Sequence, residues 1–221
     1  MESSLPPHDL LLFDLDGTLS DPILGIWQSL NYALSHFGYE PIERSQCALH
    51  VGPPLDDAFK SITRQTSPAH IAALVAKYRE RYADVGYSEN VLYPGIAETI
   101  AELNSAGVPL AVCTSKRQDF AERILEMFGL RSSFRFVDGG EVGIPKRQQI
   151  ERLLAQRAVS SATVMIGDRG VDLEAAHRHG LGAAGVLWGY GSREELLREK
   201  PRYLFSSPAK LSGLATTGAP K

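Results

Sequence analysis

Four short, largely apolar runs constrain the fold of this chain more than any other feature. They occupy residues 10–13, 108–113, 162–166 and 183–187. A run of this length, bounded by polar or turn residues, is typical of a strand that is buried on both faces of a sheet. Pro109 is expected at the start of its strand, because proline cannot donate a hydrogen bond within a central ladder. The runs therefore predict a buried parallel sheet.

The segments between the later runs have the spacing of amphipathic helices. Phe120, Ile124 and Met127 fall on one helical face, and Gly129 follows as a helix stop. Another helix is expected to begin near Lys146. Strands that alternate with helices form a parallel sheet with helices packed on its faces. The pattern predicts an α/β fold with a doubly wound, Rossmann-like parallel-sheet core.

Residues 20–88 interrupt this alternation directly after its first strand. They carry two helical stripes, within residues 26–37 and 71–82, and no convincing strand lies between these stripes. We expect an inserted helical domain over residues 20–88. The α/β core would then consist of residues 1–19 and 89–221.

Composition excludes several classes of protein. The 221 residues include 23 Lys and Arg and 26 Asp and Glu, for a formal net charge of −3, which gives no electrostatic reason to expect nucleic acid or a membrane as a partner. Two cysteines, Cys47 and Cys113, form no disulfide framework and are expected to be small buried residues. Neither a signal-peptide pattern nor the roughly 20 apolar residues of a membrane span is present. We expect a cytoplasmic monomer or homodimer.

Acidic residues follow the first and third of the predicted strands. Asp14 and Asp16 are two residues apart, so both side chains point the same way on an extended chain, and Gly17 permits a sharp turn after them. Asp168 supplies a third carboxylate at the edge where parallel sheets bind ligands. Neighbouring carboxylates repel one another unless a cation or a shared proton offsets the charge. Three hard oxygen donors suit Mg²⁺, which the sequence therefore predicts as a cofactor.

Three further polar residues belong to the same predicted edge. Thr114 follows the second strand, Asp172 lies just beyond Asp168, and Lys146 stands at a helix start after a loop. Each of these residues alone is most simply interpreted as a turn or cap residue. Their occurrence together in one sheet makes that interpretation improbable and indicates a functional site.

These residues resemble the four signature motifs of a known superfamily. The motifs are, in order, Asp-Leu-Asp-Gly-Thr at residues 14–18, Thr114, Lys146 and Gly-Asp-Arg-Gly-Val-Asp at residues 167–172. In this order and at these spacings they resemble the haloacid dehalogenase-like (HAD) phosphohydrolases, and the resemblance covers nearly the whole chain. It implies that the inserted helical domain is a cap placed after the first motif.

Two other stretches resemble one branch of that superfamily. They are Val-Gly-Pro-Pro-Leu at residues 51–55 and Leu-Trp-Gly-Tyr-Gly-Ser-Arg-Glu-Glu-Leu at residues 187–196. Both resemble the phosphoglycolate phosphatase and bacterial 5′-nucleotidase-like branch. The resemblance implies a Mg²⁺-dependent phosphatase that acts on a small phosphorylated metabolite, with nucleoside monophosphates and phosphoglycolate as the favoured substrates.

The resemblance also implies catalytic roles. Asp14 would attack phosphorus as the nucleophile and form an aspartyl-phosphate that water hydrolyses. Asp16 would protonate the leaving oxygen and later deprotonate the water. Thr114, with Ser115 as its competitor, would bind a phosphoryl oxygen, and Lys146 would bridge the nucleophile and the phosphate.

The metal site is implied in the same way. Mg²⁺ would be bound by the side chains of Asp14 and Asp168 and by the backbone carbonyl of Asp16. Asp172 would lie outside these ligands and orient a metal-bound water or Lys146.

One core motif departs from the pattern of the superfamily. In many relatives the lysine is followed by proline, whereas in this chain Pro145 precedes Lys146. Lys116 and Arg147 are therefore alternatives for the cation that binds phosphate.

The loop at residues 51–55 has two interpretations. Gly52, Pro53, Leu55 and Asp56 would contact substrate and govern specificity, or Gly52 and Pro53 would form a rigid turn before a helix while Leu55 packs between cap helices.

Other classes of protein share part of this pattern. A receiver domain also places an aspartate, a hydroxyl residue and a lysine around Mg²⁺, but its aspartate follows a middle strand of a much shorter chain. A dehalogenase of the same superfamily needs no acid at the position of Asp16. A phosphomutase shares every core motif and stays open as an alternative. A non-catalytic protein that binds a phosphorylated ligand is disfavoured, because no charged motif residue is lost.

Overall fold

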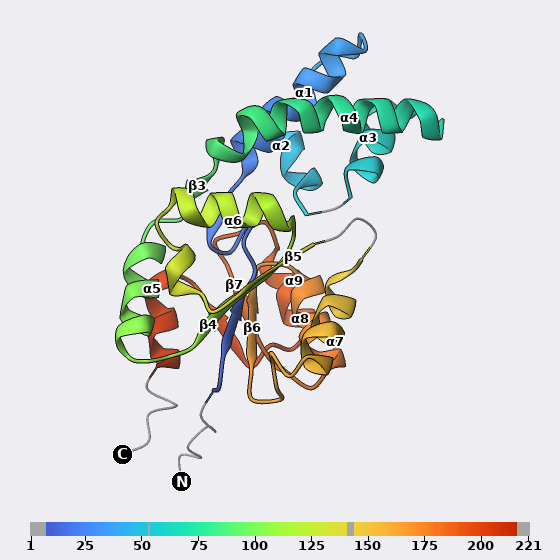
Figure 1. Ribbon diagram of the computed structural model, residues 1–221. Helices are drawn as coiled ribbons and strands as arrows, with labels where there is room; N and C mark the ends of the chain where they lie inside the picture. Colours follow the sequence, from blue (N-terminus) through green and yellow to red (C-terminus); the bar gives the residue numbers. More distant parts are fainter. Residues whose placement is uncertain (1–7, 53, 141–143, 216–221) are drawn as a thin grey trace. The chain divides into compact units, whose positions relative to one another are not determined.

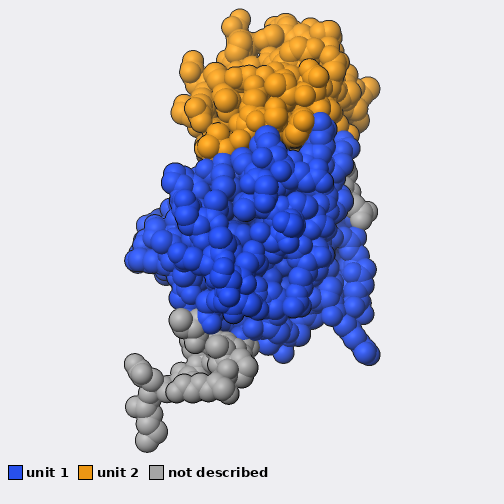
Figure 2. Space-filling model, turned by 60° about the vertical axis from the view of Figure 1, so that its left-hand side comes forward, with its two compact units in different colours: residues 1–20, 92–221 blue, residues 21–91 orange. Residues whose placement is uncertain are grey.

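The chain forms two compact units. The computed structural model describes residues 8–52, 54–140 and 144–215. The core unit comprises Met1–Ser20 and Leu92–Lys221, and the helical unit comprises Asp21–Val91, as Figure 2 shows by colour. The helical unit thus begins at residue 21 and ends at residue 91, where the sequence suggested residues 20 and 88.

The core unit contains a six-stranded sheet in the order β5-β4-β1-β6-β7-β8, in which all neighbouring strands are parallel. The strands are β1 (Leu11–Phe13), β4 (Leu110–Arg117), β5 (Val137–Gly140), β6 (Val164–Gly167), β7 (Gly182–Val186) and β8 (Tyr203–Phe205). From β1 the chain adds β4 and β5 on one side and then crosses to add β6, β7 and β8 on the other (Figure 1). The predicted doubly wound parallel sheet is confirmed. Its winding reverses beside β1, and sheets of this kind bind ligands beyond the carboxyl ends of the strands at such a reversal.

The central strand has no solvent face. All three residues of β1 are fully buried, and Leu12 pairs with Ala111 of β4 on one side and with Met165 of β6 on the other. This burial explains why the sequence shows a continuous apolar run rather than an alternating one.

Helices cover both faces of the sheet. They are α5 (Ile96–Ser105), α6 (Gln118–Met127), α7 (Lys146–Ala155), α8 (Gly170–Arg178) and α9 (Arg193–Arg198), with short 3₁₀ turns η3 (Arg131–Ser133) and η4 (Pro208–Leu214). Figure 1 shows α5 on one face and α7 and α8 on the other. Ile150 and Leu153 of α7 and Leu173 of α8 form one core with alternate residues of the strands, such as Leu12 and Met165. Each side chain of this size that is buried contributes about 1.5–3 kcal/mol.

Local signals placed two of these helices correctly. Helix α7 begins at Lys146, and α6 ends at Met127, two residues before Gly129, whose φ of +70° is a conformation that glycine adopts readily. Two strands of the six-stranded sheet lacked such a signal. β5 has the sequence Val-Asp-Gly-Gly without an apolar run, and β8 is a short, half-buried edge strand.

Strand β4 is longer than the sequence suggested. We expected it to end at Cys113 with Thr114 following it, whereas the strand continues through Thr114 to Arg117. Its register with β5 shifts between Cys113 and Arg117. Irregularities of this kind are common near functional sites, where they can change the direction of side chains.

The helical unit is built from α1 (Ile23–His36), α2 (Arg44–Cys47), η1 (Ala48–His50), α3 (Leu55–Thr63), α4 (Pro68–Asp84) and η2 (Gly86–Glu89). Pro68 occupies the first position of α4, where its missing N–H costs nothing. Gly25 of α1 lies so close to η2 that a Cβ there would be 1.9 Å from the carbonyl oxygen of Gly86. The short strands β2 (Ser20–Asp21) and β3 (Val91–Leu92) pair where the chain passes between the units. Among the described residues, every helix is too short or too polar to cross a bilayer.

Candidate active site

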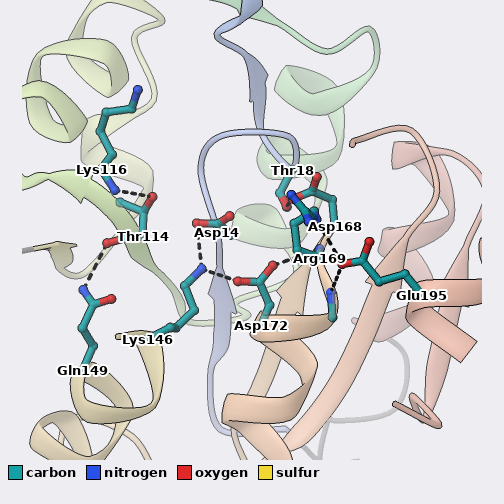
Figure 3. A network of polar contacts seen from close by, with 11 residues as sticks. Asp14, Thr18, Thr114, Lys116, Lys146, Gln149, Asp168, Arg169, Asp172 and Glu195 are labelled. Atoms are coloured by element: carbon teal, nitrogen blue, oxygen red, sulfur yellow. Dashed lines mark hydrogen bonds and ion pairs between the residues drawn. The ribbon is translucent and has the colours of Figure 1, made fainter. Parts of the chain in front are cut away.

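The charged motif residues converge at the carboxyl edge of the sheet. Asp14 directly follows β1, Asp168 directly follows β6, and Asp172 lies in the first turn of α8. Lys146 opens α7 and reaches the same place (Figure 3). All four residues are buried, with exposed fractions between 0% for Asp168 and 8% for Asp14. Charged groups are rarely buried to this degree unless they are paired or bind an ion.

Lys146 is the central cation of this cluster. Its Nζ lies 2.9 Å from Oδ1 of Asp14 and also donates to Oδ1 of Asp172, so that the ammonium group stands between two carboxylates (Figure 3). Burial alone would lower the pKa of Lys146, but the charges of Asp14 and Asp172 outweigh it and raise that pKa overall. The lysine is therefore positively charged at neutral pH.

Three buried acids lie close together at this site. One carboxylate oxygen from each of Asp14, Asp168 and Asp172 lies within 4.8 Å of the others. Burial raises the pKa of the Asp168 and Asp172 carboxyls, and the charges of Asp172 and Asp14 raise that of Asp168 further. A divalent cation would offset this repulsion, and hard oxygen donors are what Mg²⁺ prefers. The residues present therefore fit the predicted metal.

Asp172 contacts Lys146, the residue that the sequence prediction gave it to orient. One of its carboxylate oxygens also lies within 4.8 Å of oxygens of Asp14 and Asp168, and its placement outside the metal ligands stays a prediction. Two contacts account for its position. Oδ1 of Asp172 is held by Lys146, and Oδ2 accepts a hydrogen bond from the backbone N–H of Arg169 at 3.1 Å.

Asp16 points to a different partner. Its Oδ2 lies 2.7 Å from Nζ of Lys116, while its Oδ1 is buried and accepts no hydrogen bond from the described residues. Burial raises the pKa of the Asp16 carboxyl, against the attraction of Lys116, which lowers it. Lys116 is thus engaged with Asp16, and Arg147, the other alternative cation, is exposed on α7.

The end of β4 presents the hydroxyl residues. Thr114 is buried, and its Oγ1 accepts a hydrogen bond from the N–H of Lys116 at 3.2 Å. The carbonyl of Thr114 accepts another from Nε2 of Gln149 at 3.0 Å. Ser115, the next residue, is exposed. Both hydroxyl residues stay candidates for binding a phosphoryl oxygen.

Gly17 allows the first motif to approach the fourth. Its φ is +86°, and a Cβ at this position would lie 2.2 Å from Oδ2 of Asp168. No side chain larger than hydrogen fits there without displacing Asp168. Gly17, which we expected to permit a sharp turn, thus also permits the close approach of the first motif to Asp168 of the fourth.

Several contacts of the site were not predicted from the sequence. Among them are the ion pair of Lys116 with Asp16, the hydrogen bond from Gln149 to Thr114, and the binding of the Gly170 N–H by Glu195. Gln149 carried a signal that could have been used: it is a polar residue within the apolar face of α7 and is fully buried. A buried amide needs a hydrogen-bond partner, so Gln149 could have been expected to bond to one of the strand ends at the site.

The predicted specificity residues lie in the helical unit. Gly52 is exposed with a φ of +99°, Leu55 opens α3 and is half-buried, and Asp56 is exposed in the first turn. Pro53 lies outside the described residues. The role of this loop in specificity stays a prediction.

Comparison with known proteins defines the class of this chain. The family described as haloacid dehalogenase-like hydrolase matches residues 11–186. The chain is 39% identical over 187 residues to the tyrosine-protein kinase PtkA of Mycobacterium tuberculosis, an alignment that covers 82% of this chain and 63% of that protein. The chain thus spans under two thirds of the length of PtkA.

Other relatives match over nearly their full length. A 5′-nucleotidase of Pseudomonas aeruginosa is 35% identical, with 91% of this chain and 92% of that protein covered. A phosphoglycolate phosphatase of Synechococcus elongatus is 32% identical, with 91% and 94% covered. Among solved structures, a Clostridium difficile protein assigned as a phosphatase has a TM-score of 0.86 at 34% identity, covering 95% of this chain and 99% of that one.

The chain belongs to the haloacid dehalogenase-like hydrolase family. The family and the fold predicted from the motifs are confirmed. The names 5′-nucleotidase and phosphoglycolate phosphatase agree with the predicted class of enzyme, a phosphoric monoester hydrolase.

Proposed function

We propose that this chain is a Mg²⁺-dependent phosphatase that hydrolyses a small phosphomonoester through a phosphorylated Asp14. The supporting observation is the convergence of Asp14, Asp168 and Asp172 around Lys146 at the carboxyl edge of the sheet, with Asp16 two residues beyond Asp14. An isolated buried ion pair would need neither Asp168 nor Asp16. A site that binds a cation needs the additional acid Asp168, and a site that transfers a proton needs Asp16.

The reaction follows from the two aspartates of the first motif. A carboxylate oxygen of Asp14 attacks phosphorus, and the bond between phosphorus and the ester oxygen breaks as that oxygen takes a proton from Asp16. In the second half, Asp16 accepts a proton from a water molecule that attacks the phosphorus of the aspartyl-phosphate. Inorganic phosphate leaves, and both aspartates return to their starting states.

Positive charge stabilises the phosphoryl group during transfer. Lys146 touches Asp14 and is held by Asp172, so its ammonium group is already positioned where negative charge accumulates. Thr114 or Ser115 would donate a hydrogen bond to a phosphoryl oxygen. Mg²⁺, held by Asp14 and Asp168 with the backbone carbonyl of Asp16, would supply charge neutralisation in the same place, and Asp172 would orient Lys146 beside it.

Nucleoside monophosphates and phosphoglycolate are the substrates we favour. The support comes from relatives named 5′-nucleotidase and phosphoglycolate phosphatase, which match nearly the whole chain. We further propose that the helical unit selects among these esters, because it holds none of the four core motifs. A cytoplasmic location and a monomeric or dimeric state stay predictions.

A second candidate is phosphoryl transfer to tyrosine, the activity stated in the name of PtkA. The observation that favours it is the 39% identity over 187 residues. A phosphorylated Asp14 could pass its phosphoryl group to a tyrosine hydroxyl in place of water, since both attack through oxygen. Formation of phosphotyrosine from ATP and a tyrosine peptide, without phosphate release from small esters, would support this candidate against the hydrolase.

Phosphate release from a panel of esters tests the proposal. The panel contains a nucleoside monophosphate, phosphoglycolate, a sugar phosphate and phosphotyrosine, each with Mg²⁺. Asp14→Asn removes the nucleophile at nearly constant shape and should lower kcat by several powers of ten, because the site acts as a unit. The control Asp119→Asn removes an aspartate of the core unit whose side chain is 51% exposed, and it should keep full activity.

Two outcomes would contradict the proposal. Substantial phosphate release by folded Asp14→Asn would exclude the covalent route. Conversion of one ester into another without net phosphate release would indicate the phosphomutase alternative.

A further inference from the structure

The loop after β7 and the first turn of α9 have no role in the chemistry described above. They contain the segment Trp188–Glu195, which we call the clamp. We propose that the clamp fixes the Asp168 carboxylate for metal binding and that Trp188 and Glu195 are its positioning residues. The proposal depends on the role of Asp168 as a ligand of Mg²⁺ in the proposed function.

The clamp touches Asp168 directly through its backbone. The N–H of Tyr190 donates a hydrogen bond of 2.8 Å to Oδ2 of Asp168. A Cβ at Gly189 would lie 2.4 Å from the Cβ of Asp168, and one at Gly191 would lie 1.9 Å from its carbonyl oxygen. The two glycines therefore let the clamp backbone lie against Asp168, where any larger residue would force the acid to move.

The other oxygen of Asp168 is held through the first motif. Oγ1 of Thr18 donates to Oδ1 of Asp168 at 3.3 Å. The carbonyl of Thr18 in turn accepts a hydrogen bond of 2.9 Å from Nε1 of Trp188. Each oxygen of Asp168 thus receives one hydrogen bond from the described residues, and a carboxylate oxygen has a further lone pair with which to bind a cation.

Glu195 holds the backbone that follows Asp168 (Figure 3). Its Oε1 accepts hydrogen bonds from the N–H of Gly170 at 2.7 Å and from Nε of Arg169 at 3.0 Å. Gly170 is the first residue of α8, where a carboxylate is favoured by the unpaired N–H groups of the helix end. The clamp therefore holds Asp168 in two places. Tyr190 binds its side chain, and Glu195 binds the backbone that follows it.

A function in metal binding differs measurably from a purely structural one. Loss of a contact that orients a metal ligand typically weakens metal affinity by about 10–100-fold. A contact that only stabilises the fold would lower the melting temperature of the metal-free protein and leave the Mg²⁺ affinity of the folded molecules unchanged. The affinity for Mg²⁺ is therefore the deciding quantity.

The experiment measures the Kd of Mg²⁺ by titration calorimetry on the full chain without substrate. Trp188→Phe deletes the indole N–H while keeping a ring, and Glu195→Ala deletes both acceptor contacts of the carboxylate. We expect each to raise the Kd by about 10–100-fold. Glu195→Gln keeps an oxygen for the Gly170 N–H and should fall between wild type and Glu195→Ala. At saturating Mg²⁺ the kcat of each variant should return toward the wild-type value.

Two control variants carry the same chemical changes elsewhere. Trp27→Phe removes an indole hydrogen bond of 2.7 Å to the carbonyl of Ile42 in the helical unit. Glu194→Ala removes an exposed acid from the same first turn of α9. Both controls should bind Mg²⁺ as wild type does.

Wild-type Kd values in folded Trp188→Phe and Glu195→Ala would overturn the clamp and leave the proposed phosphatase standing. A wild-type protein that neither binds Mg²⁺ nor releases phosphate would overturn both.

Discussion

Removal of Lys146 tests whether the buried acids depend on this one cation. Its Nζ lies 2.9 Å from Asp14 and also pairs with Asp172, and its side chain is 4% exposed. At an effective dielectric constant of about 20, an ion pair at this distance is worth roughly 6 kcal/mol before the cost of desolvation. Loss of one partner from a buried pair typically costs about 3–5 kcal/mol, because the remaining charge is left uncompensated. We expect Lys146→Met to destabilise the metal-free core unit by about this amount.

The measurement is urea unfolding in the presence of a chelator, followed by tryptophan fluorescence. The chain has two tryptophans, Trp27 in the helical unit and Trp188 in the core unit. In a Trp27→Phe background, Trp188 alone reports the core unit. Mg²⁺ should restore part of the lost stability, because a cation among Asp14, Asp168 and Asp172 offsets the same repulsion that Lys146 relieves.

A second variant distinguishes this explanation from a simple packing defect. Adding Asp172→Asn to Lys146→Met removes one of the uncompensated charges and should recover part of the loss, since residues in contact are not additive. A Lys146→Met protein as stable as its background, or a double variant whose losses simply add, would refute the reasoning.

Three further predictions concern the metal site, residues 55 and 56 of the helical unit, and the two cysteines. Chelation should abolish phosphate release and Mg²⁺ should restore it, and full activity under thorough chelation would contradict the metal site. Ca²⁺ should restore activity poorly, because its looser coordination would hold the Asp14 carboxylate out of line with phosphorus. Leu55→Ala and Asp56→Ala should change the ratio of kcat/KM between a nucleotide and phosphoglycolate by about 10–200-fold, and a constant ratio would remove this loop from the specificity assignment. Burial raises the pKa of the Cys47 and Cys113 thiols to about 12, so neither should react with iodoacetamide at neutral pH in the folded protein, while both should react in denaturant.

Sequence reasoning succeeded where the signal is local. The apolar run before Asp14 had to be a buried strand, and a chain of alternating strands and helices has few alternatives to a doubly wound sheet. The start of α7 at Lys146 followed from the spacing of Ile150 and Leu153. Topology brought Asp14 and Asp168 together, because strand ends of a parallel sheet meet at one edge, and Lys146 reaches that edge from the start of α7.

The remaining contacts depend on side-chain geometry that a sequence does not encode locally. The ammonium group of Lys116, an alternative for the cation that binds phosphate, pairs with Asp16 across two strand ends, and the spacing of these residues did not predict that pair. Strand β5 was not predicted, because Val-Asp-Gly-Gly has neither an alternating pattern nor an apolar run. Its position beside β4 is set by tertiary packing. The hydrogen bond from the Arg169 N–H to Asp172 was likewise not predicted from the sequence.

The insertion of the helical unit after β1 has a consequence for how the chain folds during synthesis. The central strand is made first, yet its neighbour β4 begins only at Leu110 and its other neighbour β6 only at Val164. Until then Leu11–Phe13 is an apolar segment without a sheet to join, and such long-range pairings form slowly. The helical unit spans only residues 21–91, so its internal contacts close shorter loops than the pairing of Leu11 with Leu110 or Val164, and we expect it to fold first. Pulsed hydrogen exchange during refolding would then show α1 and α4 protected before β1, and the opposite order would contradict this sequence of events.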